Sequence, residues 1–347
     1  GQHQVTQKNG RRCSTAMAYL KPAKNRHNLT VMTNSPVSKV IVKNSRAIGV
    51  ELPGNNILTA NTEIVLSAGS ILSPKILMLS GIGDIEELKT HGIEAIHSLP
   101  GVGKNLQDHA ATSIMMKTKS RTPWGFSWPK LPKYSLDLFR YILFRKGVFA
   151  SHLVESGGFM RTEPNLDRPD IQLVFIPGHR APPPKQLEVG HGYCMVAVLL
   201  RPKSRGSVTL ASANPEDTPV IDHRFYEAEE DLEVILKGLK EIRRIVHADT
   251  FTKYQPTETI PGKNVQTDGE LKNYIRQYGA TIFHPVGTCK MGDDSQAVVD
   301  KRLRVRGIYG LRVVDASIMP TIVGGNTNAP SIMIGEKASD MIKEDNR

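Results

Sequence analysis

The sequence lacks the features that mark several protein classes. No apolar run in its 347 residues reaches the roughly 20 residues that cross a bilayer, so we expect no membrane span. The first residues, Gly1–Gln4, are polar and contain no signal-peptide core. Because the chain does not begin with Met, an upstream signal peptide and a secreted location both stay open. There is no internal repeat and no low-complexity tract, which excludes repeat architectures.

Cysteine is scarce, and its spacing carries no metal or disulfide pattern. The only three cysteines, Cys13, Cys194 and Cys289, are odd in number and far apart. Zinc sites and disulfide frameworks need closely spaced or evenly paired cysteines. We therefore expect buried free thiols, and we predict no metal site.

The charge is strongly positive but has no nucleic-acid pattern. Forty-five Lys and Arg against 34 Asp and Glu give a formal net charge of +11. The basic residues are scattered, with only short clusters at Arg11-Arg12 and Arg243-Arg244. A nucleic-acid interface usually shows a basic tract or stripe. We expect a solvated surface that attracts anionic partners, and no nucleic-acid partner.

A glycine-rich dinucleotide fingerprint is also missing. Chains that hold a dinucleotide on the first turn of a Rossmann-like domain use Gly-x-Gly-x-x-Gly there. The two nearest matches, Gly81-Ile82-Gly83 and Gly101-Val102-Gly103, both lack the third glycine. If this chain binds a dinucleotide, its own residues do not supply that turn.

Near the end of the chain, the pattern predicts a strand, a turn and a helix. Residues 311–314 read as a short buried strand that ends at Asp315, and Gly324-Gly325 loosen the following loop. We expect Asn328 to be the helix N-cap and Pro330 to lie in the first turn. One face then carries spaced apolar residues, namely Ile334, Ala338, Met341 and Ile342. Such a helix N-terminus suits an anionic group.

The rest of the chain divides into two kinds of pattern. Strands at 37–42, 48–52 and 63–67 precede a buried helix, expected to start near Pro74 and to stop at Gly81. From residue 110 onward we expect a largely antiparallel sheet with helices. Its strands are predicted at 111–117, 171–176, 194–200 and 208–210, and its helices at 136–145, 226–248 and 268–278.

Several blocks together resemble one family, the glucose–methanol–choline (GMC) oxidoreductases. One block runs from His284 to Lys337. It contains His284…Gly287-Thr288…Met291, Val298-Val299-Asp300, Leu303-Arg304-Val305, Leu311–Ser317…Pro320 and Asn326…Glu336-Lys337. The stretches Gly69–Gly83 and Leu99–His109 also fit the family pattern. The chain resembles the C-terminal portion of a glucose dehydrogenase-like or choline dehydrogenase-like member.

This resemblance implies a fold that combines α/β and α+β parts. Residues 1–109 would form part of a Rossmann-like FAD-binding domain, and residues 285–347 would return to it. Residues 110–284 would form an inserted substrate-binding domain on a mainly antiparallel sheet. The family's glycine fingerprint would lie upstream of Gly1. The chain is therefore expected to be either a truncated portion of a family member or a descendant that no longer binds the dinucleotide.

The resemblance also implies two catalytic residues. His284 would take the hydroxyl proton of an alcohol as a hydride leaves its carbon for flavin N5, a task that suits imidazole. Asn326 would hydrogen-bond the substrate oxygen and stabilise the developing alkoxide. His109 would be a structural residue. The alternative for His284 is a loop histidine with an ordinary structural hydrogen bond. The alternative for Asn326 is a turn residue of a common Gly-Gly-Asn sequence.

The FAD cofactor would be held at three places. The backbone at Val37 would hold the adenine. Asp315 and Ala316 would lie near the ribityl–pyrophosphate portion. Thr327 and Asn328 would lie near the flavin N1–C2 edge, where the helix N-terminus offsets negative charge.

The resemblance therefore predicts an FAD-dependent enzyme that oxidises the CH–OH group of a small alcohol to an aldehyde, ketone or lactone. Oxygen or a quinone would be its electron acceptor. Two alternatives stay open. The chain is a non-catalytic or truncated member unable to hold FAD, as the missing fingerprint would favour, or it is a flavin-containing cyanohydrin lyase on the same scaffold.

Overall fold

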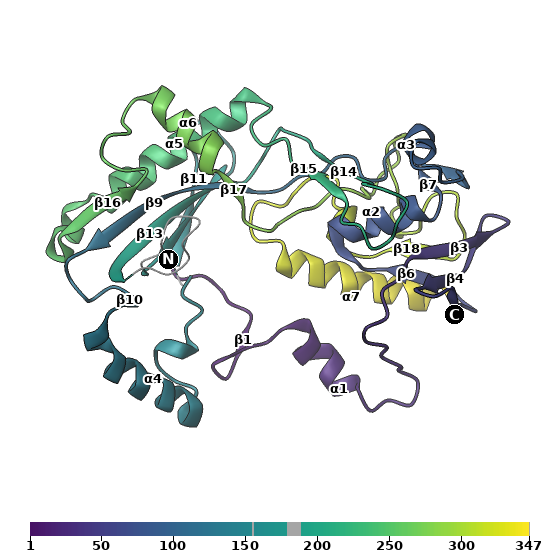
Figure 1. Ribbon diagram of the computed structural model, residues 1–347, viewed down its shortest axis with the longest axis horizontal. Helices are drawn as coiled ribbons and strands as arrows, with labels where there is room; N and C mark the ends of the chain where they lie inside the picture. Colours follow the sequence, from purple (N-terminus) through teal and green to yellow (C-terminus); the bar gives the residue numbers. More distant parts are fainter. Residues whose placement is uncertain (155, 179–188, 347) are drawn as a thin grey trace. The chain divides into compact units, whose positions relative to one another are not determined.

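The computed structural model describes residues 1–154, 156–178 and 189–346 (Figure 1). The chain forms two compact units, and each is made of separate stretches of sequence. Unit 1 contains Gly1–Thr30, Ala110–Leu200 and Glu229–Ala280. Unit 2 contains Val31–His109, Arg201–Ala228 and Thr281–Arg347.

This division differs from the predicted domain boundaries at three places, the smallest of which is that residues 281–284 belong to unit 2. Residues 1–30 belong with the central part of the chain rather than with residues 31–109. Residues 201–228 leave the central part and join unit 2, where Leu106 and Gly206 exchange two backbone hydrogen bonds. Such long-range pairing has no signal in local periodicity. The FAD-binding and substrate-binding roles of the two parts stay predictions.

Unit 1 is built on a seven-stranded sheet of order β11-β12-β13-β9-β16, with β10 paired to β13 and β17 to β9. The pairings that join β11, β12, β13, β9 and β16 are all antiparallel, as the sequence predicts. The strands are β9 (Ala110–Thr118), β10 (Gly125–Phe126), β11 (Ser156–Met160), β12 (Ile171–Ile176), β13 (Gly190–Leu199), β16 (Pro256–Ile260) and β17 (Ala280–Thr281).

Two amphipathic helices cover one face of this sheet (Figure 1). Helix α5 (Glu229–Val246) buries one apolar face, which includes Leu232, Ile235 and Leu239, and it packs on β13, β9 and β12. A Cβ on Gly238 would lie only 3.1 Å from Ile171 Cδ1, so glycine lets the helix approach the sheet closely. Helix α6 (Asp268–Tyr278) begins with a capping box between Thr267 and Glu270 and packs on α5.

The remaining elements of unit 1 are short, except for α4 (Leu131–Phe144). This helix begins five residues before the predicted start at 136, because Pro132 lies in its first turn and pre-forms the helical backbone. The others are β1 (Gln7–Lys8), β2 (Arg11–Arg12), η1 (Ala16–Leu20), α1 (Lys21–Ala23), η2 (Trp128–Lys130), η3 (Val148–Ala150) and η4 (Asp249–Tyr254).

Unit 2 combines several small sheets with three helices. The antiparallel sheet β3-β4-β5 and the parallel pair β18-β6 are the main ones, and β14-β15 and β7-β8 are two-stranded. The strands are β3 (Lys39–Lys43), β4 (Arg46–Leu52), β5 (Asn56–Thr59), β6 (Ile64–Leu66), β7 (Ile82–Gly83), β8 (His97–Ser98), β14 (Ser207–Thr209), β15 (Val220–Asp222) and β18 (Leu311–Val313).

The helices of unit 2 are α2 (Gly69–Leu79), α3 (Ile85–Thr90) and α7 (Asn328–Asp345), with the short turn η5 (Ala316–Ile318). One apolar core joins α2, β6, β18 and the buried face of α7, where Ile334 and Ala338 are buried as predicted. The predicted combination of α/β and α+β parts is confirmed. Among the described residues, no helix is both long and apolar enough to cross a bilayer.

Helix α2 begins earlier than the sequence predicts. It starts at Gly69 rather than near Pro74, so Pro74 lies inside it. Proline has no N–H to donate to the carbonyl four residues before it, which here is that of Ser70. The buried hydroxyl of Thr288 supplies the missing donor at 2.6 Å from this carbonyl oxygen. A residue far along the chain thus allows a proline in the helix interior.

We expect Thr288→Val to destabilise the protein by about 1–3 kcal/mol, because it leaves the buried Ser70 carbonyl without a donor. Urea unfolding measures this loss. In a Pro74→Ala background the new N–H of residue 74 can bond the same carbonyl, so Thr288→Val should cost less there. An equal cost in both backgrounds would contradict this explanation.

The guanidinium of Arg312 joins three segments of unit 2. Arg312, on β18, has a side chain that is only 3% exposed. It makes ion pairs with Glu63 (2.7 Å), just before β6, and with Asp345 (2.6 Å), at the end of α7. It also donates a hydrogen bond to the carbonyl of Arg302. One buried cation therefore anchors the last turn of α7 to the parallel strands.

The three cysteines are free thiols, as the sequence predicts. Cys194 is buried in the sheet of unit 1, and Cys289 is fully buried in the core of unit 2. Cys13 is half-buried in unit 1. Burial raises the pKa of the Cys289 thiol well above its usual value.

Candidate functional site

Two segments of unit 2 run side by side and bring two histidines together. Gln107 and Val286 exchange backbone hydrogen bonds (3.0 and 2.9 Å), and Ile282 N donates to His109 O at 3.2 Å. His109 comes just before β9, and His284 follows β17. This antiparallel contact places the two rings next to each other, with centroids 5.2 Å apart.

The side chains of Asn105 and Gln107 hold the loop that carries Asn326, and Asn105 donates from Nδ2 to Pro320 O at 3.3 Å. Gln107 donates from Nε2 to Pro320 O (3.1 Å) and accepts from Ile322 N (3.2 Å). Gly287 adopts φ +95°, and a Cβ there would lie 2.5 Å from Asn105 O, so only glycine fits. Gly287 thus permits close contact between the segments that carry the two histidines.

The predicted catalytic residues His284 and Asn326 are direct neighbours. Asn326 Nδ2 lies 3.2 Å from His284 Nε2. On the other side of the ring, His284 Nδ1 lies 2.9 Å from His109 Nδ1. His109 Nε2 in turn lies 3.1 Å from Val323 O. The chain of contacts therefore runs from a carbonyl through two imidazoles to a carboxamide.

When both rings are neutral, the carbonyl at one end of this chain sets their tautomers. A carbonyl oxygen only accepts, so His109 Nε2 must carry the proton. His109 Nδ1 then accepts from His284 Nδ1–H, and His284 Nε2 is left with its lone pair. The Asn326 amide, which only donates from Nδ2, fits that arrangement. Nε2 is thus the basic nitrogen of His284.

The carboxylate of Asp108 holds the backbone of both histidines. Its Oδ1 accepts from His109 N (2.7 Å) and His284 N (3.0 Å), and its Oδ2 accepts from the Thr281 hydroxyl and lies 3.2 Å from His223 Nε2. Burial alone would raise the pKa of Asp108, but hydrogen bonds from His223, Thr281 and His284 N outweigh it and lower the pKa. Asp108 therefore stays ionised.

His284 is tuned toward its neutral form. The residue is buried, with 9% of its surface exposed to solvent. Burial lowers the pKa of the imidazole below 6.5, although the nearby Asp108 carboxylate opposes this shift. The preceding residue, Phe283, has φ +65° and is 84% exposed. Such a left-handed conformation is costly for a bulky residue, and it persists where the surroundings impose it.

The N-terminus of α7 differs in one detail from the prediction. Thr327, not Asn328, is the N-cap, and Asn328 is the first residue of the helix. The Thr327 side chain makes no capping hydrogen bond. This 18-residue helix therefore begins directly after Asn326, and the Thr327 side chain does not accept from its first N–H groups.

Asp315 and Ala316 lie where β18 leads into η5. The Asp315 carboxylate accepts from Gly69 N (2.9 Å), Ser73 Oγ (2.5 Å) and Ser317 N (2.8 Å). These contacts join η5 to the start of α2. Asp315 and Ala316 are both half-buried.

Val37 lies apart from the histidines, half-buried just before β3. Its neighbour Ser38 lines a cavity of about 680 Å³, together with β3 and residues 79–81. The predicted site residues therefore form one cluster around His284, one around Asp315, and one separate position.

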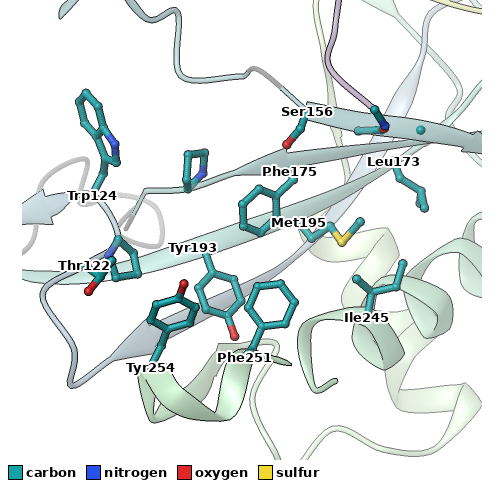
Figure 2. Close-up of a pocket in the computed structure, with 15 residues that line it drawn as sticks. Thr122, Trp124, Ser156, Leu173, Phe175, Tyr193, Met195, Ile245, Phe251 and Tyr254 are labelled. Atoms are coloured by element: carbon teal, nitrogen blue, oxygen red, sulfur yellow. The ribbon is translucent and has the colours of Figure 1, made fainter. Parts of the chain in front are cut away.

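A second cavity lies within unit 1 and contains none of the predicted site residues (Figure 2). Its volume is about 650 Å³, and the stacked rings of Tyr193 and Phe251 form one wall. Burial, with Tyr254 nearby, raises the pKa of Tyr193 to about 12. The cavity thus offers an aromatic, uncharged lining. Within the described residues, no group of three or more His, Cys, Asp or Glu could hold a metal ion.

The sequence did not indicate the partners of His284. His109 was expected to be structural, and its ring contact with His284 depends on the pairing of Gln107 with Val286. Asp108 was not singled out either. One signal was available: Asp108-His109 is a pair of ionisable residues directly before an apolar strand, within a family-pattern block.

Comparison with known proteins defines the class. Two family models, both described as GMC oxidoreductase, match residues 1–111 and 202–335. The chain belongs to the GMC oxidoreductase family.

Its relatives include a protein named alcohol dehydrogenase [acceptor] from Pseudomonas putida, 44% identical over 99% of this chain. Another is an oxygen-dependent choline dehydrogenase from Brucella ovis, 42% identical over 99% of this chain. The chain covers 63% of the length of each of these two relatives.

Solved structures share the fold. A formate oxidase superposes with a TM-score of 0.88 at 28% identity, over 98% of this chain and 64% of that one. Pyridoxine 4-oxidase from Mesorbium loti superposes with a TM-score of 0.84 at 28% identity, over 98% of this chain and 63% of that one. These similarities agree with the α/β and α+β fold described above.

Proposed function

We propose that the protein is an FAD-dependent oxidoreductase that oxidises the CH–OH group of a small alcohol to an aldehyde, ketone or lactone. The observation that carries the proposal is the position of His284 Nε2, which holds a lone pair beside the Asn326 carboxamide. A base and a hydrogen-bond donor at one point are what an alcohol hydroxyl needs when it loses its proton.

In this proposal His284 accepts the hydroxyl proton at Nε2. The lowered pKa of the imidazole keeps it neutral near pH 7, ready to accept that proton. The Asn326 amide then turns from His284 to the substrate oxygen and donates to the developing alkoxide. His109 keeps the His284 proton on Nδ1, which leaves Nε2 available.

The residues of unit 2 fit an FAD molecule. The N-terminus of α7 presents the positive end of the helix dipole beside Asn326, where Thr327 and Asn328 would stabilise an electron-rich flavin edge. A Cβ added to Gly325 would meet no atom within 4 Å, so the loop before this helix leaves space for a ligand. When bound, FAD supplies the hydride acceptor.

The other parts of FAD would lie at two further positions of unit 2. Asp315 and Ala316 lie at the β18–η5 turn, where their backbone would face the ribityl–pyrophosphate portion. Val37 would hold the adenine through its backbone. Its neighbour Ser38 borders the cavity of about 680 Å³ described above.

The relatives' names suggest alcohols as substrates, and one names oxygen while another names an unspecified acceptor. We propose a small-molecule alcohol as the electron donor, and oxygen or a quinone as the acceptor.

Absorbance spectra test the proposal. Purified protein should show flavin bands, and an oxidisable alcohol should bleach them without oxygen. Protein that stays colourless after incubation with FAD would support the non-catalytic alternative. Flavin that alcohols never bleach, together with release of cyanide from a cyanohydrin, would support the lyase alternative.

The proposed role of His109 has its own test. His109→Leu removes the acceptor for His284 Nδ1–H, so the His284 proton can move to Nε2 and block the base. We expect anaerobic flavin reduction to slow by about tenfold or more, since fixing a catalytic tautomer has a large effect in other enzymes. His109→Gln, whose side-chain oxygen can accept the same hydrogen bond, should recover most of the rate. Equal rates for the two variants would contradict the tautomer role.

A further inference from the structure

Helix α4 turns its apolar side away from the protein. Leu136, Phe139, Ile142 and Leu143 are each more than half exposed. They recur at the spacing of one helix face, which in a globular protein normally faces the core. Here the face points outward instead.

Polar contacts fix α4 in this orientation. The inner side carries Tyr134 and Asp137. Tyr134 donates from its hydroxyl to Gly125 O (2.7 Å), and the buried Asp137 carboxylate pairs with Lys133 (3.3 Å). The outward position of the apolar residues is therefore built into the packing of the helix.

Aromatic residues on both sides of α4 extend this surface. Trp128 on η2 is 71% exposed, and Phe126 and Phe149 are also exposed. We call the whole set the α4 surface, consisting of Phe126, Trp128, Leu136, Phe139, Ile142, Leu143, Phe144 and Phe149. Scattered apolar residues are normal at a protein surface, but a gathered set of this size marks an interaction site.

The α4 surface is surrounded by positive charge. Residues 126–149 contain five cations, Lys130, Lys133, Arg140, Arg145 and Lys146, and one acid, Asp137. Within the part of the chain that the structure describes, Lys130, Arg140 and Lys146 have no acidic partner. Their charges are available to an anionic surface.

We propose that the α4 surface binds an anionic phospholipid bilayer, with α4 lying in the plane of the interface. Helices with Trp, Phe and Leu on one side and Lys or Arg beside them insert that side among the headgroups, while the cations meet lipid phosphates. At 14 residues α4 is too short to cross a bilayer, so it would lie on the membrane rather than span it.

Charge favours lipid over a second copy of the chain. In a twofold dimer through this surface, the excess cations of one copy would face those of the other. Such like-charge contact opposes association. The proposal uses only residues of unit 1 and does not depend on the alcohol-oxidising function.

Vesicle flotation tests the proposal with the purified full chain. Protein should float with vesicles of phosphatidylcholine and phosphatidylglycerol, and much less with phosphatidylcholine alone. Added salt should weaken binding, because part of the attraction is electrostatic. Phe139→Glu/Leu143→Glu should lower the vesicle-bound to free ratio by about tenfold or more.

A matched control substitutes exposed apolar residues of unit 2. Ile85 and Tyr309 are 47% and 72% exposed, and Ile85→Glu/Tyr309→Glu should float like the wild type. If the α4 variant does not fold, Arg140→Glu/Lys146→Glu tests the same surface through its charge and should also lower binding. The proposal is overturned if wild-type protein does not float or if the folded variants float equally well. It is also overturned if light scattering shows a wild-type dimer that the α4 substitutions dissociate, since the surface would then bind a second copy.

Discussion

His284→Ala should slow the reduction of bound flavin by alcohol by about 10²–10⁴-fold, the usual contribution of a positioned base. The variant loses the only ring nitrogen that faces Asn326, so the substrate hydroxyl has no proton acceptor there. Stopped-flow absorbance under anaerobic conditions measures the first-order reduction at saturating alcohol.

The pH dependence separates loss of a base from a change in binding. In the wild type the pKa of His284 lies below 6.5. Above this pKa the imidazole is neutral and the rate should be constant; below it the imidazole takes up a proton and the rate should fall. In His284→Ala the rate should keep rising with pH, because solvent hydroxide must replace the base.

Two control variants define what the result means. His247→Ala removes an exposed histidine of unit 1 that pairs with Glu258, and it should leave the rate unchanged. Asn326→Ala should slow reduction as well, by a smaller factor, and keep the wild-type pH profile. If His284→Ala reduces flavin at the wild-type rate and with the wild-type pH profile, His284 is not the base.

Arg312→Met should lower the free energy of unfolding by about 3 kcal/mol, which is the order expected when a buried ion pair loses one partner. The substitution keeps the apolar stem but leaves Glu63 without this cation and Asp345 with Arg302 alone. Urea unfolding followed by circular dichroism measures the change. Arg304→Met is the matched control, since Arg304 pairs with Asp300 at the surface and should contribute less than about 1 kcal/mol.

The loss in free energy of unfolding caused by Arg312→Met should depend on pH. Hydrogen bonds from Arg312 and Arg302 lower the pKa of Asp345 below its usual value of 3.8. A carboxylate with a lowered pKa stabilises the folded state above that usual value, and the contribution is lost as the pH falls through the lowered pKa. The difference in free energy of unfolding between wild type and variant should therefore become smaller at acidic pH. A gap that widens in acid would show that the ion pair is not the cause.

Sequence patterns predicted the parts of the fold that depend on local periodicity. Strand β12 and helix α6 have the predicted bounds, because apolar alternation and a capping box are local signals. The predicted start of α2 was wrong. The hydroxyl donor that permits Pro74 inside the helix comes from Thr288, which is far along the chain. The periodicity of α4 predicted a helix but could not show that its apolar side faces outward.

The candidate site was predictable in the same uneven way. The family pattern pointed to His284 and Asn326, and the structure places them in contact. The tautomer of His284 depends on His109 and on the carbonyl of Val323, which meet only after three loops assemble. These contacts join residues that are far apart in the sequence and follow no fixed spacing, so no sequence motif could have revealed them.

The two buried thiols can report separately on the opening of unit 1 and of unit 2. Cys194 belongs to unit 1 and Cys289 to unit 2, and neither can react with a thiol reagent until its surroundings open. Labelling rates at the two sulfurs, followed by peptide mass spectrometry, would report the opening free energy of each unit within one sample. If the rates respond to Arg312→Met only at Cys289, the units open independently; a shared response would mean that they unfold as one cooperative body.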